Sequence, residues 1–355
     1  MPILNAPLPD GPLALLGDIH GEIDALDTLL ARIDALPGPR RALVFVGDLV
    51  DRGPDSVAVV QRVRALVDAG RAFAIAGNHE LNILLGDEKD GNGWFFGHNE
   101  DVHIASLGGR VPYHSRLATP AERTDIRAFL ATLPLVLTRA DLRVVHAAWD
   151  ASAAARLPAA GDLMDVFDHF ERPLLSSVAR LRAEADAERR PWADLRDANI
   201  VPPPHLPAVQ AFSLVEQNQN PVKVLTSGLE NPVDLPFFTG GKWRYVERAR
   251  WWEAAPPDRP TVVGHYWRRR VPGAAHGDKP DPWDTVAPFA WANGVFCVDY
   301  AVGRRYVHRH QLAAALPGTP ARAPGALAAL LWPEATLLFD DGDGQPIPTV
   351  HAPPR

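Results

Sequence analysis

The chain has 355 residues, 46% of them hydrophobic, which is enough apolar material for a sizeable core in one large or two small domains. Its formal net charge of −7 disfavours nucleic acid as the main partner, because phosphate backbones attract basic surfaces. Cys297 is the single cysteine, so an internal disulfide is excluded and metal sites must use nitrogen and oxygen ligands.

We expect neither a membrane segment nor an export signal. No apolar run approaches the ~20 residues that a membrane-spanning helix requires. The N-terminal stretch lacks the basic region that opens a signal peptide, and a strand explains its apolar residues better. We therefore expect a cytoplasmic protein without a membrane partner.

Short apolar runs alternate with helical patterns over the first 150 residues. Strands are predicted at 13–16, 42–46, 72–76 and 142–145, and helices at 23–36, 56–69 and 119–132. The last helix opens with a capping box from Thr119 to Glu122 and has Pro120 at its first helical position. The regular alternation of strands and helices predicts an α/β core.

The chain changes character after residue 150. A charged, mostly helical stretch and a proline-rich loop come first, and strands are then predicted at 222–226, 261–263, 295–298 and 304–309. We interpret residues 1–355 as a single domain in which 151–250 forms an insertion or cap. A separate subdomain in that range is the alternative.

Three glycine-framed motifs each follow a predicted strand directly: GDIHG at 17–21, GDLVDRG at 47–53 and GNHE at 77–80. Their polar side chains therefore lie just past the carboxyl ends of strands, where open α/β sheets bind ligands. Asp18, Asp48 and Asn78 are 30 residues apart, which is one strand–helix–strand step each.

These residue types are metal ligands. Carboxylates, imidazoles and an amide oxygen suit Mn²⁺, Fe or Zn²⁺ better than Ca²⁺, and one carboxylate can bridge two metals roughly 3.5–4 Å apart. His146 and His265 each end an apolar strand, where a lone histidine is more often structural. Here we interpret both as ligands, because the three motifs leave a second metal short of nitrogen donors. We expect two divalent transition-metal ions, with manganese preferred over iron or zinc.

The motifs GDIHG, GDLVDRG, GNHE, VVHAA at 144–148 and VVGH at 262–265, in this order, resemble those of the calcineurin-like metallophosphoesterases. Within that family they resemble the phosphoprotein-phosphatase branch, which includes serine/threonine phosphatases and bacterial diadenosine tetraphosphate hydrolases. The resemblance implies an αββα sandwich of two packed β-sheets flanked by helices, here with a largely helical insertion. Its metals would sit at the strand ends between the sheets.

The resemblance also implies a role for each matching residue. Six residues would hold the metals: Asp18 and His20 the first, Asn78, His146 and His265 the second, and Asp48 both. His79 would protonate the leaving oxygen, Asp51 would orient it, and Arg52 would clamp the phosphoryl oxygens. The implied reaction is hydrolysis by a metal-bridging water without a covalent intermediate.

The sequence departs from the family pattern around the substrate. Ala76 stands where many protein phosphatases of this branch carry arginine, and 57–59 lacks a glutamate often found after DRG. The family's second phosphate-binding arginine has three candidates here: Arg244, Arg248 and Arg250.

The preferred interpretation is a phosphomonoesterase that resembles serine/threonine protein phosphatases and acts on a phosphorylated protein or a small phosphate ester. A dinucleoside polyphosphate hydrolase is the alternative, and a catalytically silent binding protein is a remote one.

Two features stay open at this level. Six of the ten tryptophans lie between Trp243 and Trp291, where we expect core packing under a cap, with a nucleobase-stacking wall as the alternative. Glu80 either supports the ligands from behind or simply begins a helix.

Overall fold

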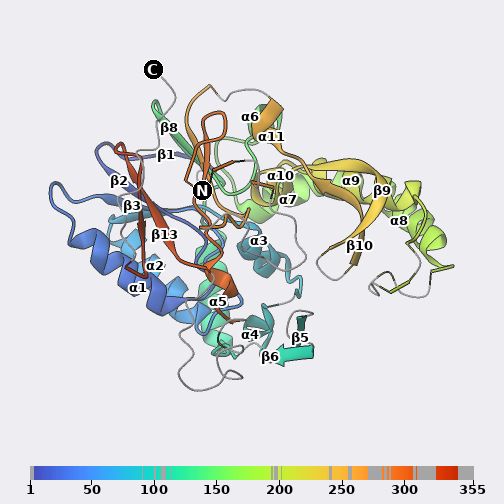
Figure 1. The fold of residues 1–355 in the computed structure, drawn as a ribbon, viewed down its shortest axis with the longest axis horizontal. Coiled ribbons are helices and arrows are strands. Elements are labelled where there is room, and N and C mark those ends of the chain that lie inside the picture. Colours follow the sequence, from blue (N-terminus) through green and yellow to red (C-terminus); the bar gives the residue numbers. More distant parts are fainter. Residues whose placement is uncertain are drawn as a thin grey trace.

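In the computed structural model, two five-stranded sheets pack face to face and helices cover their outer faces (Figure 1). The structure describes residues 4–89, 91–99, 101–104, 109–112, 114–192, 195, 199–200, 202–239, 242–254, 258–270, 282–283, 286–287, 289–306, 309 and 325–342. The predicted two-sheet α/β sandwich is confirmed.

The first sheet has the strand order β14-β13-β2-β3-β4. Its strands are β2 (Leu13–Leu16), β3 (Ala42–Phe45), β4 (Ala72–Ala74), β13 (Ala328–Trp332) and β14 (Thr336–Phe339). The first three are parallel because α1 (Ile23–Asp34) and α2 (Ser56–Asp68) cross over between them, whereas β13 and β14 run antiparallel. The carboxyl ends of β2, β3 and β4 therefore meet at one edge.

The second sheet has the order β1-β7-β8-β11-β12. Its strands are β1 (Asn5–Pro7), β7 (Val136–Arg139), β8 (Leu142–Val145), β11 (Thr261–Val263) and β12 (Val295–Cys297). Because β8, β11 and β12 are parallel, their carboxyl ends also lie side by side. This sheet joins strands more than a hundred residues apart in sequence.

All four residues of β2 are apolar because its side chains point alternately to two faces of the sheet and both faces are buried. Leu13 and Leu15 pack with residues of the second sheet, while Ala14 and Leu16 join the cluster that contains the buried faces of α1 and α2. Both faces of the strand are thus buried, as in a parallel sheet covered on both sides.

Several short elements surround the motif loops. These are α3 (Asn78–Leu85), α4 (Gly93–Phe96), β5 (Asp101–Ile104), β6 (Gly109–Pro112), α5 (Pro120–Leu130) and the 3₁₀ helix η3 (Val302–Arg304). The capping box predicted for α5 is confirmed, since the Glu122 amide donates to Thr119 Oγ1 at 3.3 Å and the Thr119 amide donates to Glu122 Oε2 at 2.8 Å.

The middle of the chain extends to one side of the sandwich (Figure 1). Its elements are α6 (Ala151–Arg156), α7 (Leu163–Glu171), η2 (Arg172–Leu174), α8 (Leu175–Arg189), α9 (Pro207–Asn218), α10 (Pro221–Ser227), β9 (Glu230–Thr239), β10 (Lys242–Arg248) and α11 (Trp251–Ala254). We call α8, α9 and the β9–β10 hairpin the arm. The arm has a small core of its own around Phe212 and Tyr245.

Two predicted strands are wrong. Residues 222–226 lie in α10, because Asn220 accepts the Val222 amide at 3.0 Å and Pro221 occupies the first helical turn, so local capping outweighs the β-branched composition. Residues 304–306 are helical, while 307 and 308 lie outside the described part. Here Ala301 adopts a left-handed conformation and donates its amide to Asp299, which turns the chain out of the sheet.

Among the described residues, no helix combines the length and the apolarity needed to cross a membrane. The limits of an insertion at 151–250 remain a prediction.

Candidate metal centre

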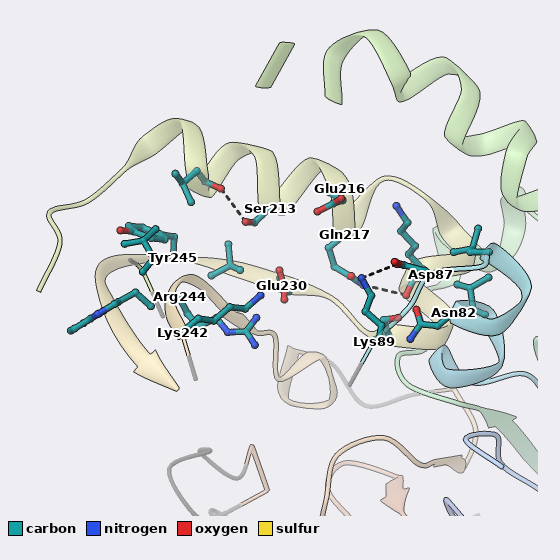
Figure 2. Close-up of a pocket in the computed structure, with 18 of the residues that line it drawn as sticks. Asn82, Asp87, Lys89, Ser213, Glu216, Gln217, Glu230, Lys242, Arg244 and Tyr245 are labelled. Atoms are coloured by element: carbon teal, nitrogen blue, oxygen red, sulfur yellow. Dashed lines mark hydrogen bonds and ion pairs between the residues drawn. The ribbon is translucent and has the colours of Figure 1, made fainter. Parts of the chain in front are cut away.

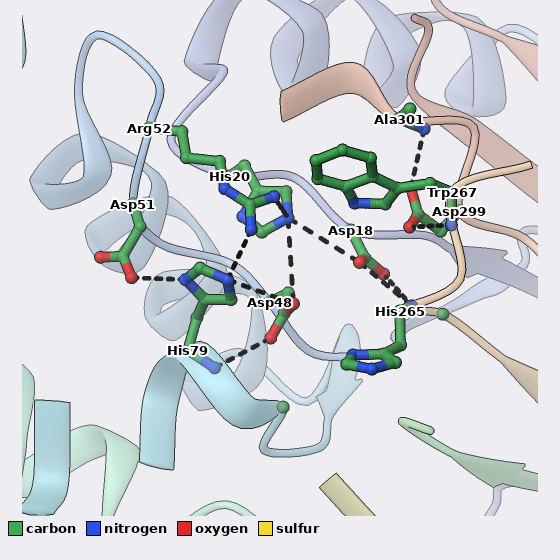
Figure 3. Close-up of polar contacts among 12 residues, drawn as sticks. Asp18, His20, Asp48, Asp51, Arg52, His79, His265, Trp267, Asp299 and Ala301 are labelled. Atoms are coloured by element: carbon green, nitrogen blue, oxygen red, sulfur yellow. Dashed lines mark hydrogen bonds and ion pairs between the residues drawn. The ribbon is translucent and has the colours of Figure 1, made fainter. Parts of the chain in front are cut away.

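The motif loops meet where the carboxyl ends of both sheets converge. Asp18 and His20 follow β2, Asp48 follows β3, and Asn78 opens α3 after β4. From the second sheet, His146 follows β8 directly, and His265 follows β11 after Gly264. All six predicted metal ligands are thus brought to one place, part of which Figure 3 shows.

One group of ligand atoms forms around Asp48, His146 and His265, whose donor atoms all lie within 4.8 Å of one another. His146 Nε2 lies 3.2 Å from Asp48 Oδ1 and 3.3 Å from Asn78 Oδ1. His265 Nδ1 lies 2.9 Å from the same Asn78 oxygen. Four donors therefore converge in the arrangement expected for the second metal.

A second group contains His20, Asp48 and His79. His20 Nε2 lies 3.8 Å from Asp18 Oδ2 and 3.8 Å from Asp48 Oδ2. Its other ring nitrogen lies 3.0 Å from the Val50 carbonyl, which orients Nε2 toward the carboxylates. Asp48 belongs to both groups, so its carboxylate has the position that a bridging ligand requires.

The backbone is bent sharply at the ligands. His20, Asp48 and His265 have φ values of 49°, 50° and 68°, in the left-handed region that non-glycine residues rarely adopt. Such conformations cluster at functional sites, where the surrounding structure holds them in place. Here the strand ends and their hydrogen bonds aim the side chains inward.

Two glycines allow the ligand loops to approach each other. A Cβ atom on Gly77 would lie 2.3 Å from Asp48 Oδ1, and one on Gly264 would lie 2.2 Å from Asp18 Oδ1. Any larger residue would therefore push a carboxylate out of the centre.

The carboxylates are crowded and buried. Burial and the neighbouring Asp299 raise the pKa of Asp18 well above its usual value, and burial also raises the pKa of Asp299. Burial would raise the pKa of Asp48 too, but the adjacent His146 and His79 hold it well below its usual value. Burial lowers the pKa of His20 and His265, which favours the neutral imidazoles that bind metals.

The donor set fits divalent cations. Buried acids that repel one another are stabilised by positive charge, and imidazole with carboxylate oxygen suits transition metals. His265 Nε2 is also a buried nitrogen without a hydrogen-bond partner among the described residues. These observations support the predicted metal centre and leave the identity of the metal open.

His79 is held at the edge of the centre by Asp51. Its Nδ1 lies 2.5 Å from Asp51 Oδ2, while Trp94 Nε1 donates to the other Asp51 oxygen at 2.8 Å. The Asp51 amide donates to Ser56 Oγ. This chain of contacts points His79 Nε2 toward Asp48, at 3.9 Å (Figure 3).

Arg52 lies beside the candidate metal ligands and contacts both His20 and His79. Its two terminal nitrogens lie 2.7 Å from His20 Nε2 and 2.9 Å from His79 Nε2. Its guanidinium also lies over the Trp267 ring, 5.1 Å from the centroid. No acidic partner of Arg52 is found among the described residues, so its charge faces the ligand cluster.

Glu80 supports the ligands from behind. Its carboxylate accepts the backbone amides of Asp48, Leu49 and Gly77, each at 2.8 Å. It therefore ties the second motif to the third, and its contact with the Gly77 amide also caps the start of α3, so both interpretations left open by the sequence hold.

Three further residues, none of them among the predicted ligands or catalytic residues, contribute to the centre. Asp299 contacts Asp18 and accepts the amides of Trp267 and Ala301 at 2.9 and 2.7 Å. Its sequence signal is its place after the strand predicted at 295–298, where Val298-Asp299 continues the motif series. Trp94 lies just after GNHE, in a segment for which a place at the border of the substrate cleft was the alternative to a solvated loop, whereas Trp267 carried no such signal.

Of the three candidate arginines, Arg248 is the one near the centre. Its charge contributes to the lowered pKa of His265, and its guanidinium lies 5.6 Å from the Tyr266 ring centroid. Arg250 instead lies 3.4 Å from Glu253, and Arg244 faces Glu230.

The tryptophan-rich segment is partly core. Trp252 and Trp283 are buried and stack with their ring centroids 4.2 Å apart. For these two residues the preferred expectation of core packing is confirmed.

Comparisons with known proteins agree with the resemblance seen in the motifs. Residues 11–127 match the family model described as calcineurin-like phosphoesterase. A symmetrical bis(5'-nucleosyl)-tetraphosphatase of Janthinobacterium sp. (strain Marseille) is 33% identical over 150 residues, which cover 40% of this chain and 47% of the relative. One from Ralstonia nicotianae is 47% identical over 73 residues, covering 21% of this chain and 24% of the relative.

The chain therefore spans about half, or less, of the length of these curated relatives. Among solved structures, a cold-active protein-tyrosine phosphatase of a psychrophilic Shewanella species is 18% identical with a TM-score of 0.43, and the match covers 95% of this chain and 82% of that one. The predicted enzyme class, a metal-dependent phosphoric ester hydrolase, agrees with the family match.

Proposed function

We propose, from the calcineurin-like phosphoesterase segment that this chain carries at residues 11–127, that the protein is a metal-dependent hydrolase of dinucleoside polyphosphates. The observation that carries the hydrolytic chemistry is the position of Asp48, which is shared by two groups of ligand atoms at the convergence of both sheets. A centre of this kind suits hydrolysis at phosphorus.

The residues present would hold two cations. Asp18 and His20 would bind one, Asn78, His146 and His265 the other, and Asp48 would contact both. Bound cations lower the pKa of water and polarise phosphoryl oxygens. Manganese as the resident metal and a cytoplasmic location remain predictions.

The chain's own cations would bind the phosphoryl group. Arg52 presents two terminal nitrogens toward the ligand cluster, a geometry suited to bidentate contact with phosphoryl oxygens. Arg248 lies near His265, over the ring of the adjacent Tyr266, and is our choice for the second phosphate contact.

His79 would protonate the leaving oxygen. Its Nδ1 contacts Asp51, which orients the ring so that Nε2 faces Arg52 and the Asp48 carboxylate, where the phosphoryl group would bind. Trp94 Nε1 donates to the Asp51 carboxylate, and the Asp51 amide donates to Ser56 Oγ. These two contacts hold Asp51 in one orientation.

The substrate proposal differs from the preferred interpretation of the sequence. Curated relatives of this chain are symmetrical bis(5'-nucleosyl)-tetraphosphatases, which supports the class ranked second on the motifs alone. Ala76 stands where many protein phosphatases of this branch carry an arginine, and this difference also favours a dinucleoside polyphosphate over a phosphoprotein as substrate. A phosphorylated peptide or a small phosphate monoester is retained as the competing substrate, because the centre would bind either.

The test compares substrates on purified protein with added Mn²⁺. We expect diadenosine tetraphosphate to be cleaved with at least tenfold higher kcat/KM than the best phosphoserine or phosphothreonine peptide. The Asp48→Asn variant should lose turnover and metal, as shown by elemental analysis of both proteins. A preference for peptides would restore the phosphomonoesterase interpretation. If no substrate is hydrolysed with any divalent metal, the proposal that the protein is a hydrolase is refuted.

A further inference from the structure

We propose that the pocket between α3, α9 and the β9–β10 hairpin binds the part of the substrate distal to the scissile bond, and that it takes a nucleoside with its attached phosphates. The pocket has a volume of ≈ 960 Å³, within the roughly 300–1,000 Å³ typical of small-molecule sites. The assignment rests on the proposed function and extends it to a region outside the motifs (Figure 2).

The first helix after the metal ligands leads directly into this pocket. Asn78 and Asn82 are four residues apart on α3, so they lie on the same face, about 6 Å apart along the axis. Asn82, Leu81 and Leu85 line the pocket. A substrate bound at Asn78 therefore needs to extend by about one helical turn to enter it.

A strand of the arm connects the same two places independently. Lys242 and Arg244 of β10 line the pocket, and Arg248, farther along that strand, lies near His265. At ~3.4 Å per residue, Arg244 and Arg248 are separated by roughly 13 Å along the strand. Positive side chains thus continue from the metal centre into the pocket, as a chain of phosphates requires.

Glu230 is the acid beside these cations. It is half-buried and lies opposite Arg248 in the register of the β9–β10 hairpin. Burial raises the pKa of Glu230, whereas the nearby charges of Arg244, Arg248 and Lys242 act to lower it (Figure 2). The three other acids of the pocket have cations of their own. Glu171 lies 3.0 Å from Lys223, Asp87 lies 2.8 Å from Lys89, and Glu216 lies 3.6 Å from Arg182. Along β10, positive charge therefore exceeds negative charge.

Aromatic rings also line the pocket. Trp192 and Trp243 both belong to its wall, and both are half-buried. Trp243 packs edge-on against Phe238 with the centroids 5.7 Å apart, which holds the indole in place. A nucleobase stacks on such a surface whatever its identity. Trp243 belongs to the tryptophan-rich segment for which a stacking wall was the alternative, whereas Trp252 of that segment is buried in the core.

The experiment measures binding without turnover. The Asp48→Asn protein is titrated calorimetrically with diadenosine tetraphosphate, ATP and inorganic tripolyphosphate. Adding Arg244→Glu should raise the Kd of all three ligands at least tenfold, because a phosphate-facing charge is reversed. The matched control is Arg180→Glu on α8, an exposed arginine paired with Glu184 outside the pocket wall, and its Kd values should stay within twofold.

A second variant separates base from phosphate recognition. Trp243→Ala should weaken ATP and diadenosine tetraphosphate but leave tripolyphosphate unchanged. If Arg244→Glu does not fold, as judged by its melting curve, Arg244→Gln with Lys242→Gln replaces it, with an expected rise in Kd of at least threefold.

Equal affinities in the Arg244 and Arg180 variants would overturn the assignment. Because binding is measured in a protein that cannot turn over, the outcome is separate from that of the proposed function. If the wild type hydrolyses none of the substrates, the proposed hydrolase function is rejected. If Arg244→Glu leaves the Kd unchanged, the proposed binding role of the pocket is rejected.

Discussion

At the residue scale, the His79–Asp51 contact is the clearest candidate for proton transfer. Because Asp51 is fully buried and also receives Trp94 Nε1 at 2.8 Å, it holds the imidazole in one orientation. General acids contribute on the order of 10²–10⁴-fold, so we expect His79→Ala to lower kcat on alkyl phosphates by that range. Steady-state kinetics on an alkyl and an aryl phosphate would measure it, and the loss should shrink on p-nitrophenyl phosphate, whose leaving group hardly needs a proton.

Elemental analysis must show that the His79→Ala variant retains its metal content. Equal losses on both substrates would argue against the acid role.

At the element scale, the N-terminus of α5 predicts a pH-dependent contribution to stability. The Arg116 side chain, followed by the Thr119 amide, lowers the pKa of Glu122 from 4.5 to about 2. A carboxyl with a depressed pKa stabilises the fold above its unfolded value of 4.5, and this contribution is lost as the pH falls toward 2. We expect Glu122→Ala to cost about 1 kcal/mol at pH 7, and the difference from wild type to shrink below pH 4.5. Urea unfolding at several pH values measures it.

The control for that helix is Glu184→Ala on α8, where an exposed i,i+4 pair with Arg180 at 2.7 Å is removed. Such surface pairs contribute about 0.3–0.5 kcal/mol, so this variant should stay close to wild type. A difference for Glu122→Ala that is the same at pH 7 and pH 3 would contradict the capping explanation.

At the scale of the whole molecule, the candidate metal centre lies where the two sheets meet. Asp18 and Asp48 come from the first sheet, whereas His146, His265 and Asp299 follow strands of the second. Cations that bind only the folded chain stabilise it by about 2.7 kcal/mol at a hundredfold excess over Kd. At roughly 2–4 °C per kcal/mol, chelation should lower Tm by about 5–10 °C, and Mn²⁺ should restore it. Scanning calorimetry provides the measurement, and Asp48→Asn should respond less. An unchanged Tm after verified metal removal would oppose a structural contribution from the ions.

The sequence by itself determined the parts that depend on local order. Strands at 13–16, 42–46 and 142–145 followed from short apolar runs, the start of α5 followed from its capping box, and the motif loops followed from glycines at strand ends. A candidate ligand set could be predicted because each of its residues lies shortly after a strand, parallel strands bring their carboxyl ends together, and the motifs resemble those of a known family. The strand predicted at 222–226 failed because capping by Asn220 outweighed the composition of the segment.

Only the tertiary structure decided what lies around that centre. The His265 amide donates to Asp18 across 247 residues of sequence, and Asp299 reaches Asp18 from another strand of the second sheet. No local pattern specifies such pairs, because they depend on how two sheets pack. The same holds for the choice of Arg248 among three arginines and for the pocket beneath the arm, which joins α3 to a hairpin more than 140 residues later. Chemistry that depends on residue type could be predicted from the sequence, whereas selectivity for the rest of the substrate depends on packing between distant segments.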